Sequence, residues 1–465
     1  MSLPRDLGQL RASGYQPSSV KDEMRRNLID KIRRNETLFP GIVGYDDTVI
    51  PQVENAVLSG QDIVLLGERG QAKTRLARSL VSLLDPSVPV VAGSEVNDDP
   101  MAPISRFAIS EIAEKGDATP IAWIRPDSRY GEKLATPDIT IADLIGEVDP
   151  IKVAEGRYLS DEMTIHYGLL PRTNRGVFCI NELPDLAERI QVGLLNIMEE
   201  RDVQIRGYKV RLELDLFVVA SANPEDYTNR GRIITPLKDR FGTQIRTHYP
   251  RAIGHEIDIM ESERAHYGVA GVEVRVPGYM KEIIAEITHA ARRSSEISQR
   301  SGVSVRVSIT NFENVVANAI KRAVRQGESV AVPRISDLIA TRASTGGKIE
   351  LESFGESRDD RVLDRIVQTA VLAAWARQFS AVELKPIVDA FEAGSQVEAS
   401  DHLAATTYIR SIAAIPPLRE IIGRVVEDDT SEPTLAAATE FVLEGLHLNR
   451  KLNKDRVDGT NRYRG

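Results

Sequence analysis

Several features are scarce in this chain of 465 residues. It has one cysteine, Cys179, so it cannot form an intramolecular disulfide. Its longest apolar runs are only as long as a strand, which excludes a transmembrane helix. Residues 1–34 are polar and charged and contain no apolar stretch typical of a signal peptide. We therefore expect a cytoplasmic protein without membrane insertion.

Basic charge is also in short supply. The chain has 59 basic and 68 acidic residues and a net charge of −9, whereas proteins that coat nucleic acid usually have a basic excess. We do not expect a nucleic-acid partner, because only the short C-terminal tail is basic. His166, His248, His255 and His266 lack the spacing typical of metal ligands, so no histidine-based metal site is predicted.

Residues 38–250 alternate short apolar runs with helical patterns. This alternation predicts an α/β domain with a mainly parallel sheet and flanking helices. The predicted strands are Ile63–Leu66, Val90–Ala92, Val177–Ile180, Phe217–Ala220 and Gln244–Thr247.

The segments on either side of this domain have different patterns. Residues 1–37 predict a charged arm with one short helix at about 22–34. Residues 251–345 and 357–449 have helical periodicity, and residues 344–356 predict a linker between them. The polar, basic tail at 450–465 is typical of a disordered segment.

The apolar run Ile63–Leu66 leads into the segment Gly67–Thr74, which a predicted helix at Arg75–Leu83 follows. A strand, a glycine-rich turn and a helix in this order form a cradle for phosphate oxygens. Gly67 and Gly70 supply the backbone freedom that lets consecutive N–H groups converge. The segment therefore predicts a nucleoside triphosphate site.

Three positions within this loop define the expected chemistry. Lys73 can place its ammonium between the terminal phosphates, and Thr74 can offer its hydroxyl to Mg²⁺. Ala72 occupies a position where the general pattern has glycine, and we expect alanine to be tolerated there with a negative φ.

A second buried strand ends in Asn181 and Glu182. Glu182 is placed to act as the base that activates the attacking water. The usual arrangement has aspartate before this glutamate. Asn181 can accept a hydrogen bond from a metal-bound water but brings no charge, so we expect weaker Mg²⁺ affinity and retained chemistry.

Three further residues have two readings each. Asn223 follows the strand Phe217–Ala220 and either holds the attacking water or belongs to a simple turn. Arg240 forms a local salt bridge or reaches a neighbouring subunit's γ-phosphate as an arginine finger. Arg306 is an exposed residue before a helix or contacts the nucleotide.

In this order, the motifs resemble those of AAA+ ATPases, with the closer match to the ATPase subunit of magnesium chelatase and to MoxR-type chaperones. Five segments resemble, in turn, the adenine-contacting segment, Walker B, sensor 1, the finger motif and sensor 2. They are Phe39–Tyr45, Gly176–Leu183 with Leu194–Arg201 and Ile205–Gly207, Ala222–Glu225, Leu237–Gly242 and Val303–Arg306.

This resemblance implies a P-loop AAA+ domain followed by a helical lid and a further C-terminal helical region, with ATP and Mg²⁺ as cofactors. It also implies a homo-oligomer, a hexameric ring in the family, in which Arg240 completes the neighbour's site. Residues 141–149 resemble an insertion that often faces the central pore. The expected catalytic residues are Lys73, Glu182, Asn223 and Arg240; the nucleotide-binding residues are Ile42, Val43, Gly44, Gly67, Gly70, Gln71, Ala72, Lys73, Thr74 and Arg306; the magnesium ligands are Thr74 and Asn181.

Two functions remain open at this stage. The first is an ATP-hydrolysing motor or chaperone that remodels a partner protein. By resemblance that partner is a separate protein with a von Willebrand factor A domain, since this chain lacks an Asp-x-Ser-x-Ser motif. The alternative is a nucleotide-gated scaffold with little turnover because of Asn181. A transcriptional activator is disfavoured, because the Gly-Ala-Phe-Thr-Gly-Ala loop and a C-terminal helix-turn-helix are missing.

Overall fold

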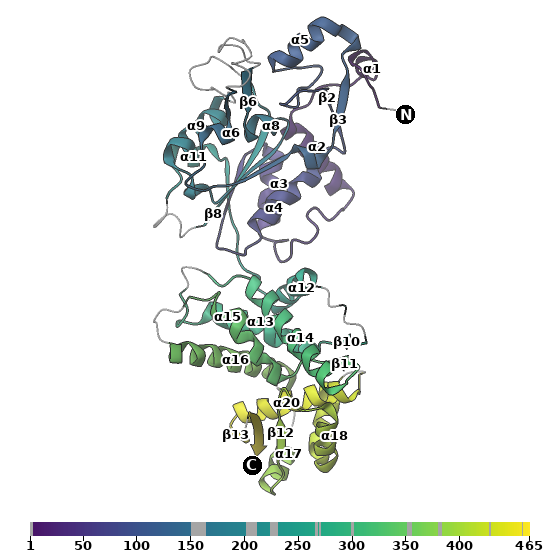
Figure 1. The fold of residues 1–465 in the computed structure, drawn as a ribbon, viewed down its shortest axis with the longest axis vertical. Helices are drawn as coiled ribbons and strands as arrows, with labels where there is room; N and C mark the ends of the chain where they lie inside the picture. The colour runs from purple at the N-terminus through teal and green to yellow at the C-terminus, as the bar shows by residue number, and fades with distance from the viewer. Residues whose placement is uncertain are drawn as a thin grey trace. The chain divides into compact units, whose positions relative to one another are not determined.

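The structure is a computed structural model, and its chain divides into two compact units, Met1–His248 and Tyr249–Gly465. Each unit is described by itself (Figure 1). The described residues are 3–149, 164–200, 212–223, 231–265, 268, 271–298, 302–350, 356–379, 384–426, 429–457 and 459–465.

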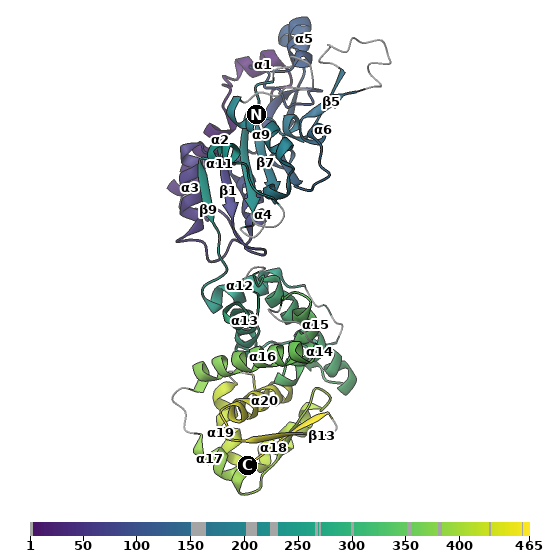
Figure 2. The same ribbon diagram turned by 90° about the vertical axis from the view of Figure 1, so that its left-hand side faces the viewer.

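The first unit is built on a five-stranded sheet with the order β4-β7-β8-β1-β9. Every neighbouring pair in this sheet is parallel, as the alternating sequence pattern predicts. Figure 2 shows β9, β1 and β7 in this order across the sheet, with β8 between β1 and β7. The strands are β1 (Ile63–Leu66), β4 (Tyr130–Leu134), β7 (Gly176–Asn181), β8 (Leu216–Ala222) and β9 (Thr243–Arg246).

Helices cover both faces of the sheet, and successive strand residues alternate between them. On one face, Ile63 and Leu65 pack with α2, α3 and α4; on the other, Val64 packs with the core that contains α9 and α11. These helices are α2 (Val20–Arg33), α3 (Val49–Ser59), α4 (Lys73–Ser79, continued by the 3₁₀ helix η1 at Leu80–Leu83), α9 (Glu188–Glu200) and α11 (Thr235–Arg240).

One predicted strand does not belong to this sheet. The run predicted at Val90–Ala92 is β2 (Val88–Val91), which pairs antiparallel with β3 (Ile121–Ile124) in a separate two-stranded sheet. The edge of the main sheet is instead β4, which the sequence analysis missed. Tyr130–Leu134 contains two charged residues and a glycine, so its composition does not distinguish it from a loop.

The N-terminal residues form part of the core of the first unit. Helices α1 (Leu7–Ala12) and α2 carry buried leucines, and Met24 and Leu28 of α2 are completely buried. Glu23 accepts hydrogen bonds from both terminal nitrogens of the buried Arg129, at 2.7 and 2.6 Å. The helix expected at 22–34 is present. The expectation of a separate charged arm is wrong, because these helices pack into the first unit. Such long-range contacts give no signal in the local sequence pattern.

The region between the two nucleotide motifs forms small elements. The segment expected to be an insertion, 141–149, forms α6 and β5, and β5 pairs antiparallel with β6. The elements are α5 (Arg106–Lys115), η2 (Gly116–Ala118), η3 (Pro126–Arg129), α6 (Ile141–Leu144), β5 (Gly146–Val148), β6 (Ile165–Tyr167), α8 (Leu169–Arg172) and η5 (Leu183–Asp185). Residues Arg201, Ile205–Gly207 and Pro224–Glu225 of the expected motifs lie outside the described residues.

The second unit is mainly helical and has one large hydrophobic core that extends from Met260 to Tyr463. Residues on both sides of the expected linker, such as Leu338 and Val362, contribute to this core, so 251–345 and 357–449 pack together. Its helices are α12 (Ile253–Glu263), α13 (Gly278–Arg293), α14 (Arg306–Gln326), η6 (Ile335–Ala340), α15 (Thr341–Gly346), α16 (Glu356–Phe379), α17 (Lys385–Glu392), α18 (Ala405–Ala414), α19 (Pro416–Val425) and α20 (Glu432–Leu448); its short parallel pair is β10 (Glu273–Val274) with β11 (Val330–Ala331).

The C-terminal tail is not disordered, contrary to the sequence prediction. β13 (Asn453–Val457) and β14 (Thr460–Arg464) form a hairpin, and β14 also pairs with β12 (Val397–Ala399). Tyr463 is 2% exposed and its hydroxyl donates to Glu444, which also accepts from Lys454. One buried aromatic residue and these ion pairs order a segment whose overall composition is polar.

No helix within the described ranges is both long and apolar enough to cross a membrane.

Candidate functional site

The predicted phosphate loop connects β1 to α4, and α4 begins at Lys73. Gly70 has a φ of 76° and Ala72 a φ of 54°, so both adopt the left-handed conformation. The expectation of a negative φ at Ala72 is wrong. The loop needs the same backbone turn here that glycine usually provides, and a side chain in this conformation costs about 1–2 kcal/mol.

Gly67 is required by close approach. A Cβ atom added to Gly67 would lie 1.9 Å from Oγ1 of Thr247 and 2.2 Å from Oε1 of Gln71. Gln71 Oε1 accepts hydrogen bonds from the backbone N–H of Glu68 (3.1 Å) and from Thr247 Oγ1 (2.7 Å). The Gln71 side chain therefore fixes the loop to the end of β9.

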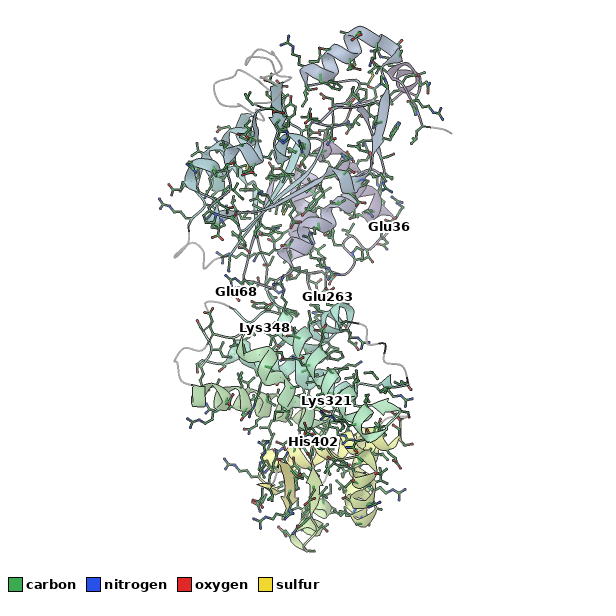
Figure 3. The ribbon with its side chains drawn as sticks, in the orientation of Figure 1. Glu36, Glu68, Glu263, Lys321, Lys348 and His402 are labelled. Atoms are coloured by element: carbon green, nitrogen blue, oxygen red, sulfur yellow. The ribbon has the colours of Figure 1, made fainter. Side chains whose placement is uncertain are left out.

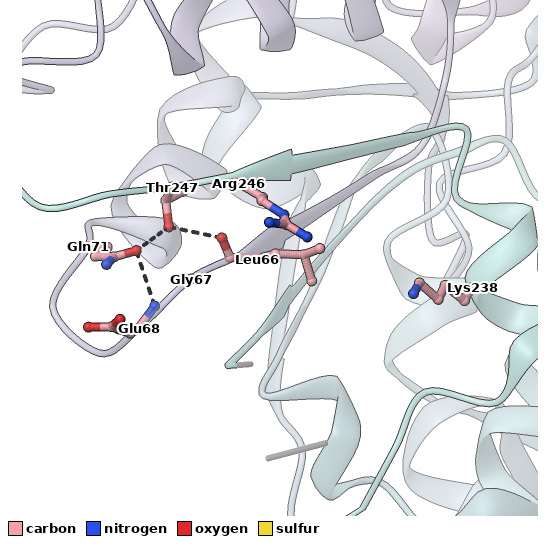
Figure 4. A pocket seen from close by; sticks show the side chains of 7 residues that line it. All are labelled: Leu66, Gly67, Glu68, Gln71, Lys238, Arg246 and Thr247. Atoms are coloured by element: carbon pink, nitrogen blue, oxygen red, sulfur yellow. Dashed lines mark hydrogen bonds between the residues drawn. The ribbon is translucent and has the colours of Figure 1, made fainter. Parts of the chain in front are cut away.

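These residues border a pocket of about 380 Å³ at the ends of β1 and β9 (Figure 4). Gln71 and Thr247 lie on one side, and Lys238 of α11 lies on the other. Lys238 and Arg246 bring two positive charges and Glu68 one negative charge, so the net positive charge makes this pocket suitable for anions. The lining residues are Leu66, Gly67, Glu68, Gln71, Lys238, Arg246 and Thr247.

The segment expected to contact adenine is held against the phosphate loop. Ile42 is buried, Val43 and Gly44 are partly buried, and the chain then reaches Tyr45. The Tyr45 hydroxyl lies 2.8 Å from the Gln71 carbonyl and 2.9 Å from the His248 carbonyl, both of which it can donate to. Burial raises the pKa of Tyr45 to about 12, so it stays a donor.

Lys73 is buried at the start of α4. Its ammonium donates to the backbone carbonyls of Gly67 and, at 2.9 Å, Glu68. The ammonium is thus at the loop where phosphate oxygens are expected, and a bound phosphate would exchange these carbonyls for stronger charged acceptors.

The end of β7 meets the start of α4 through two side chains. Thr74 Oγ1 donates to Asn181 Oδ1 at 3.2 Å, and Ser221 Oγ donates to the same oxygen at 3.1 Å. Mg²⁺ prefers oxygen ligands and usually keeps several waters, so a hydroxyl and an amide oxygen converging here fit the protein's share of a magnesium site. Nothing in this donor set excludes the ion.

Glu182 follows directly and has a φ of 54°, a left-handed conformation that is rare for a side chain of this type. Its backbone N–H donates to Ser221 Oγ at 3.2 Å. Ser221 therefore positions both Asn181 and Glu182. Backbone conformations of this kind are typical of functional sites.

Asn223 lies directly after β8, which runs between β7 and β1. Asn223 is 1% exposed, and within the described part of the chain its Oδ1 has no hydrogen-bond partner. A buried amide oxygen without a partner is rare, and it suits a group that binds a water or a ligand. The carboxyl ends of the parallel strands β1, β7 and β8 thus bring the loop, Glu182 and Asn223 to the same end of the sheet.

The two arginines, Arg240 and Arg306, lie on helices in different units. Arg240 is the last residue of α11 and forms an ion pair with Glu199 of α9. This contact corresponds to the local salt bridge, one of its two predicted roles. Arg306 is the exposed first residue of α14 in the second unit. The ammonium of Lys348 (Figure 3) donates to Thr310 of α14, and the pKa of Lys348 is lowered by burial and by the Arg306 charge.

Sequence reasoning missed two residues of the site, Thr247 and Glu132, which support the loop and the Asn181 side chain through hydrogen bonds. Tyr45 was identified only as part of the expected adenine-contacting segment, and it contacts the loop through its hydroxyl. No local signal identified Glu132, because β4 was not recognised as a strand. Over the described residues, no group of three or more His, Cys, Asp or Glu side chains forms a further metal site.

No family model matches the chain. It is 27% identical over 235 residues to the magnesium-chelatase subunit ChlI-1 of Arabidopsis thaliana, a match that covers 49% of this chain and 52% of that protein. It is 27% identical over 232 residues to the magnesium-chelatase 38 kDa subunit of Cereibacter sphaeroides, covering 49% and 64%. The chain therefore spans about half to two thirds of the length of these relatives.

Among solved structures, a model of the BchI–BchD complex of magnesium chelatase aligns with 71% of this chain and 95% of its own, at 19% identity and a TM-score of 0.37. A likeness this low adds nothing to the geometry described above. In the order of its motifs, in its parallel sheet and in its sequence relatives, this chain is similar to the AAA+ ATPases of the magnesium-chelatase branch.

Proposed function

We propose that the chain binds ATP with Mg²⁺ and hydrolyses it. The observation that carries this proposal is the convergence at one sheet edge of the phosphate loop, the Thr74–Asn181 contact of 3.2 Å, Glu182 and the unpartnered amide oxygen of Asn223. Phosphoryl transfer depends on positioning and charge stabilisation, and these groups supply both.

Each residue has a distinct role in the proposed reaction. Lys73 exchanges its two backbone carbonyls for phosphate oxygens, while Thr74 and Asn181 hold Mg²⁺, which neutralises charge on the phosphates when bound. Glu182 accepts the proton of the attacking water. Asn223 holds that water through its side-chain amide.

The first test of this proposal is nucleotide affinity in Lys73→Ala. We expect the variant to lose ATP binding, because the only buried ammonium of the loop is removed. Lys115→Ala is the matched control: Lys115 is an exposed lysine paired with Glu111 on α5, so its loss should leave affinity unchanged. Unchanged ATP affinity in Lys73→Ala would contradict the phosphate-loop assignment.

We further propose that the active form is a homo-oligomer, a hexameric ring by family resemblance, and that it remodels or activates a partner protein. The partner is a separate protein with a von Willebrand factor A domain. In the ring Arg240 leaves Glu199 and completes the neighbour's site as an arginine finger. Arg306 contacts the nucleotide and couples lid position to the phosphate state.

The oligomeric proposal is tested by mixing variants. Arg240→Ala should bind ATP without turnover, and Glu182→Gln should do the same. In a mixed ring, the site of an Arg240→Ala subunit keeps its own Glu182 and receives Arg240 from a neighbouring Glu182→Gln subunit. Such a site is intact, so mixing should restore part of the activity. Failure to restore it in verified mixed rings would contradict the finger role of Arg240.

The second candidate function is a nucleotide-gated scaffold with little hydrolysis. The neutral Asn181 at the position of the usual aspartate favours it. In that case Lys73 and Thr74 would remain necessary for function, whereas Glu182→Gln would have no effect.

A further inference from the structure

The side chain of Asn181 is held at both ends. Its Oδ1 accepts hydrogen bonds from Thr74 and Ser221, and its Nδ2 donates to Glu132 Oε1 at 2.8 Å. Asn181 is 6% exposed, so few other arrangements are open to it. Turning the amide by 180° would aim its oxygen at a carboxylate and its NH₂ group at Thr74.

Glu132 is itself firmly placed. It lies on the edge strand β4, which pairs in parallel with β7. Leu134 lies opposite Asn181, and Glu132 is two residues before Leu134. Arg78 of α4 donates to both carboxylate oxygens, at 2.7 and 2.9 Å, and the Tyr130 hydroxyl donates at 3.1 Å. The carboxylate of Glu132 is therefore held by three side-chain donors, from Arg78, Tyr130 and Asn181.

We infer that Glu132 is a positioning residue of the magnesium site, and that Glu132 and Asn181 together replace the single aspartate found at this position in the family pattern. Glu132 fixes the amide so that its oxygen faces Thr74, and it provides a negative charge one side chain farther from the ion. This inference rests on the proposed function, because it assumes that Mg²⁺ accompanies ATP.

Because of the Glu132–Asn181 hydrogen bond, the effect expected of Asn181→Asp is opposite to the one that the family pattern suggests. Asn181→Asp restores the usual aspartate but puts a second carboxylate about one hydrogen-bond length from Glu132, and adjacent like charges cannot both ionise freely. The single change should therefore weaken the site. Changing both residues, Asn181→Asp with Glu132→Gln, restores one carboxylate and one amide, with the Gln amide donating to the new aspartate.

The test is a Mg²⁺ titration of the binding of a fluorescent, non-hydrolysable ATP analogue to the full chain. In Glu132→Ala we expect the Mg²⁺ concentration at half-maximal effect to rise about 10–100-fold, the range for loss of a residue that orients a metal ligand. Asn181→Asp should also raise it, and the double variant should return it to within about threefold of the natural chain.

Glu111→Ala is the control. Glu111 forms a surface ion pair with Lys115 on α5, so its loss should leave the Mg²⁺ requirement unchanged. Thermal unfolding of each variant shows whether it folds. The double variant, Asn181→Asp with Glu132→Gln, should fold even if Glu132→Ala does not.

The outcomes separate the two proposals. If the natural chain fails to bind the analogue at any Mg²⁺ concentration, the proposed function is overturned, and the role of Glu132 with it. If the natural chain binds but Asn181→Asp alone improves the Mg²⁺ requirement, only the role of Glu132 is overturned. An unchanged requirement in a folded Glu132→Ala has the same meaning.

Discussion

The two compact units of the molecule both bury polar and charged side chains, but they use them differently. In the second unit the buried charges are paired across helices. Asp337 accepts hydrogen bonds from Arg322, Asn318 and the backbone of Arg334, and Glu256 accepts from Arg292 and Ser308. The first unit also has buried pairs, such as Glu23 with Arg129, but further buried polar groups collect at the carboxyl ends of its parallel strands, among them Asn181, Ser221 and Asn223.

The backbone shows the same difference. Among the described residues, five of the six non-glycine residues with positive φ lie in the first unit, and two of these, Ala72 and Glu182, are at the proposed nucleotide site. Buried charge alone therefore does not identify a site in this molecule. Unfavourable backbone conformations together with a buried, unpartnered Asn223 oxygen do.

The largest effect that would sharpen this comparison is expected from Asp337→Ala. It leaves Arg322 buried without its carboxylate, so the free energy of unfolding should fall by about 3–5 kcal/mol. Urea unfolding measures this change. The control, Asp364→Ala, breaks a half-exposed pair with Arg342 and should cost about 0–1 kcal/mol. Equal effects of the two variants would show that the buried pairs of the second unit are not structural.

Acid should weaken the second unit through Glu256. Burial alone would raise the pKa of this carboxyl, but His289, Arg292 and Ser308 bring it below its ordinary 4.5. Its stabilising contribution is therefore complete above about pH 4.5 and is lost as the pH falls through the lower folded-state pKa. The stability difference between the natural chain and Glu256→Gln should shrink on acidification. A difference that stayed constant from pH 7 to pH 3 would contradict this assignment.

A smaller effect is expected from the loop of the first unit. Ala72→Gly removes the conflict between a side chain and a positive φ, so unfolding of this unit should require about 1 kcal/mol more. Gly70→Ala is the reciprocal change and should destabilise by about 1–2 kcal/mol. Stabilisation by Gly70→Ala would show that the loop conformation is not the one described.

The smallest effect concerns Cys179, which is completely buried in β7. Burial raises the pKa of the thiol to about 12. At pH 8 it should react with a thiol reagent only as fast as the first unit unfolds. Rapid labelling of the folded chain would indicate that β7 is exposed, and that the sheet edge is not rigid.

The sequence was informative where one segment carries its own chemistry. The loop at Gly67–Thr74 follows strand β1, and the Asn181–Glu182 step comes at the end of strand β7, as predicted. The chemical roles of these site residues remain proposals.

The missed features all depend on contacts distant in the chain. β4 is polar and is a strand only because β7 lies beside it. Strands β13 and β14 of the tail are ordered by Glu444 and by β12, and helix α2 by Arg129 and the sheet. The conformation of Ala72 follows from the shape of the loop, which composition does not reveal.

The central claim is that the residues at the carboxyl ends of β1, β7 and β8 hydrolyse ATP. The most direct measurement is ATP turnover per subunit over a range of protein concentrations, for the natural chain and for Glu182→Gln. We expect turnover that rises with concentration, because neighbouring subunits share sites, and that falls by about 10²–10⁴-fold in Glu182→Gln, because the general base is lost. Tight ATP binding with equal turnover in both proteins, also in the presence of the partner, would contradict the account and favour the scaffold.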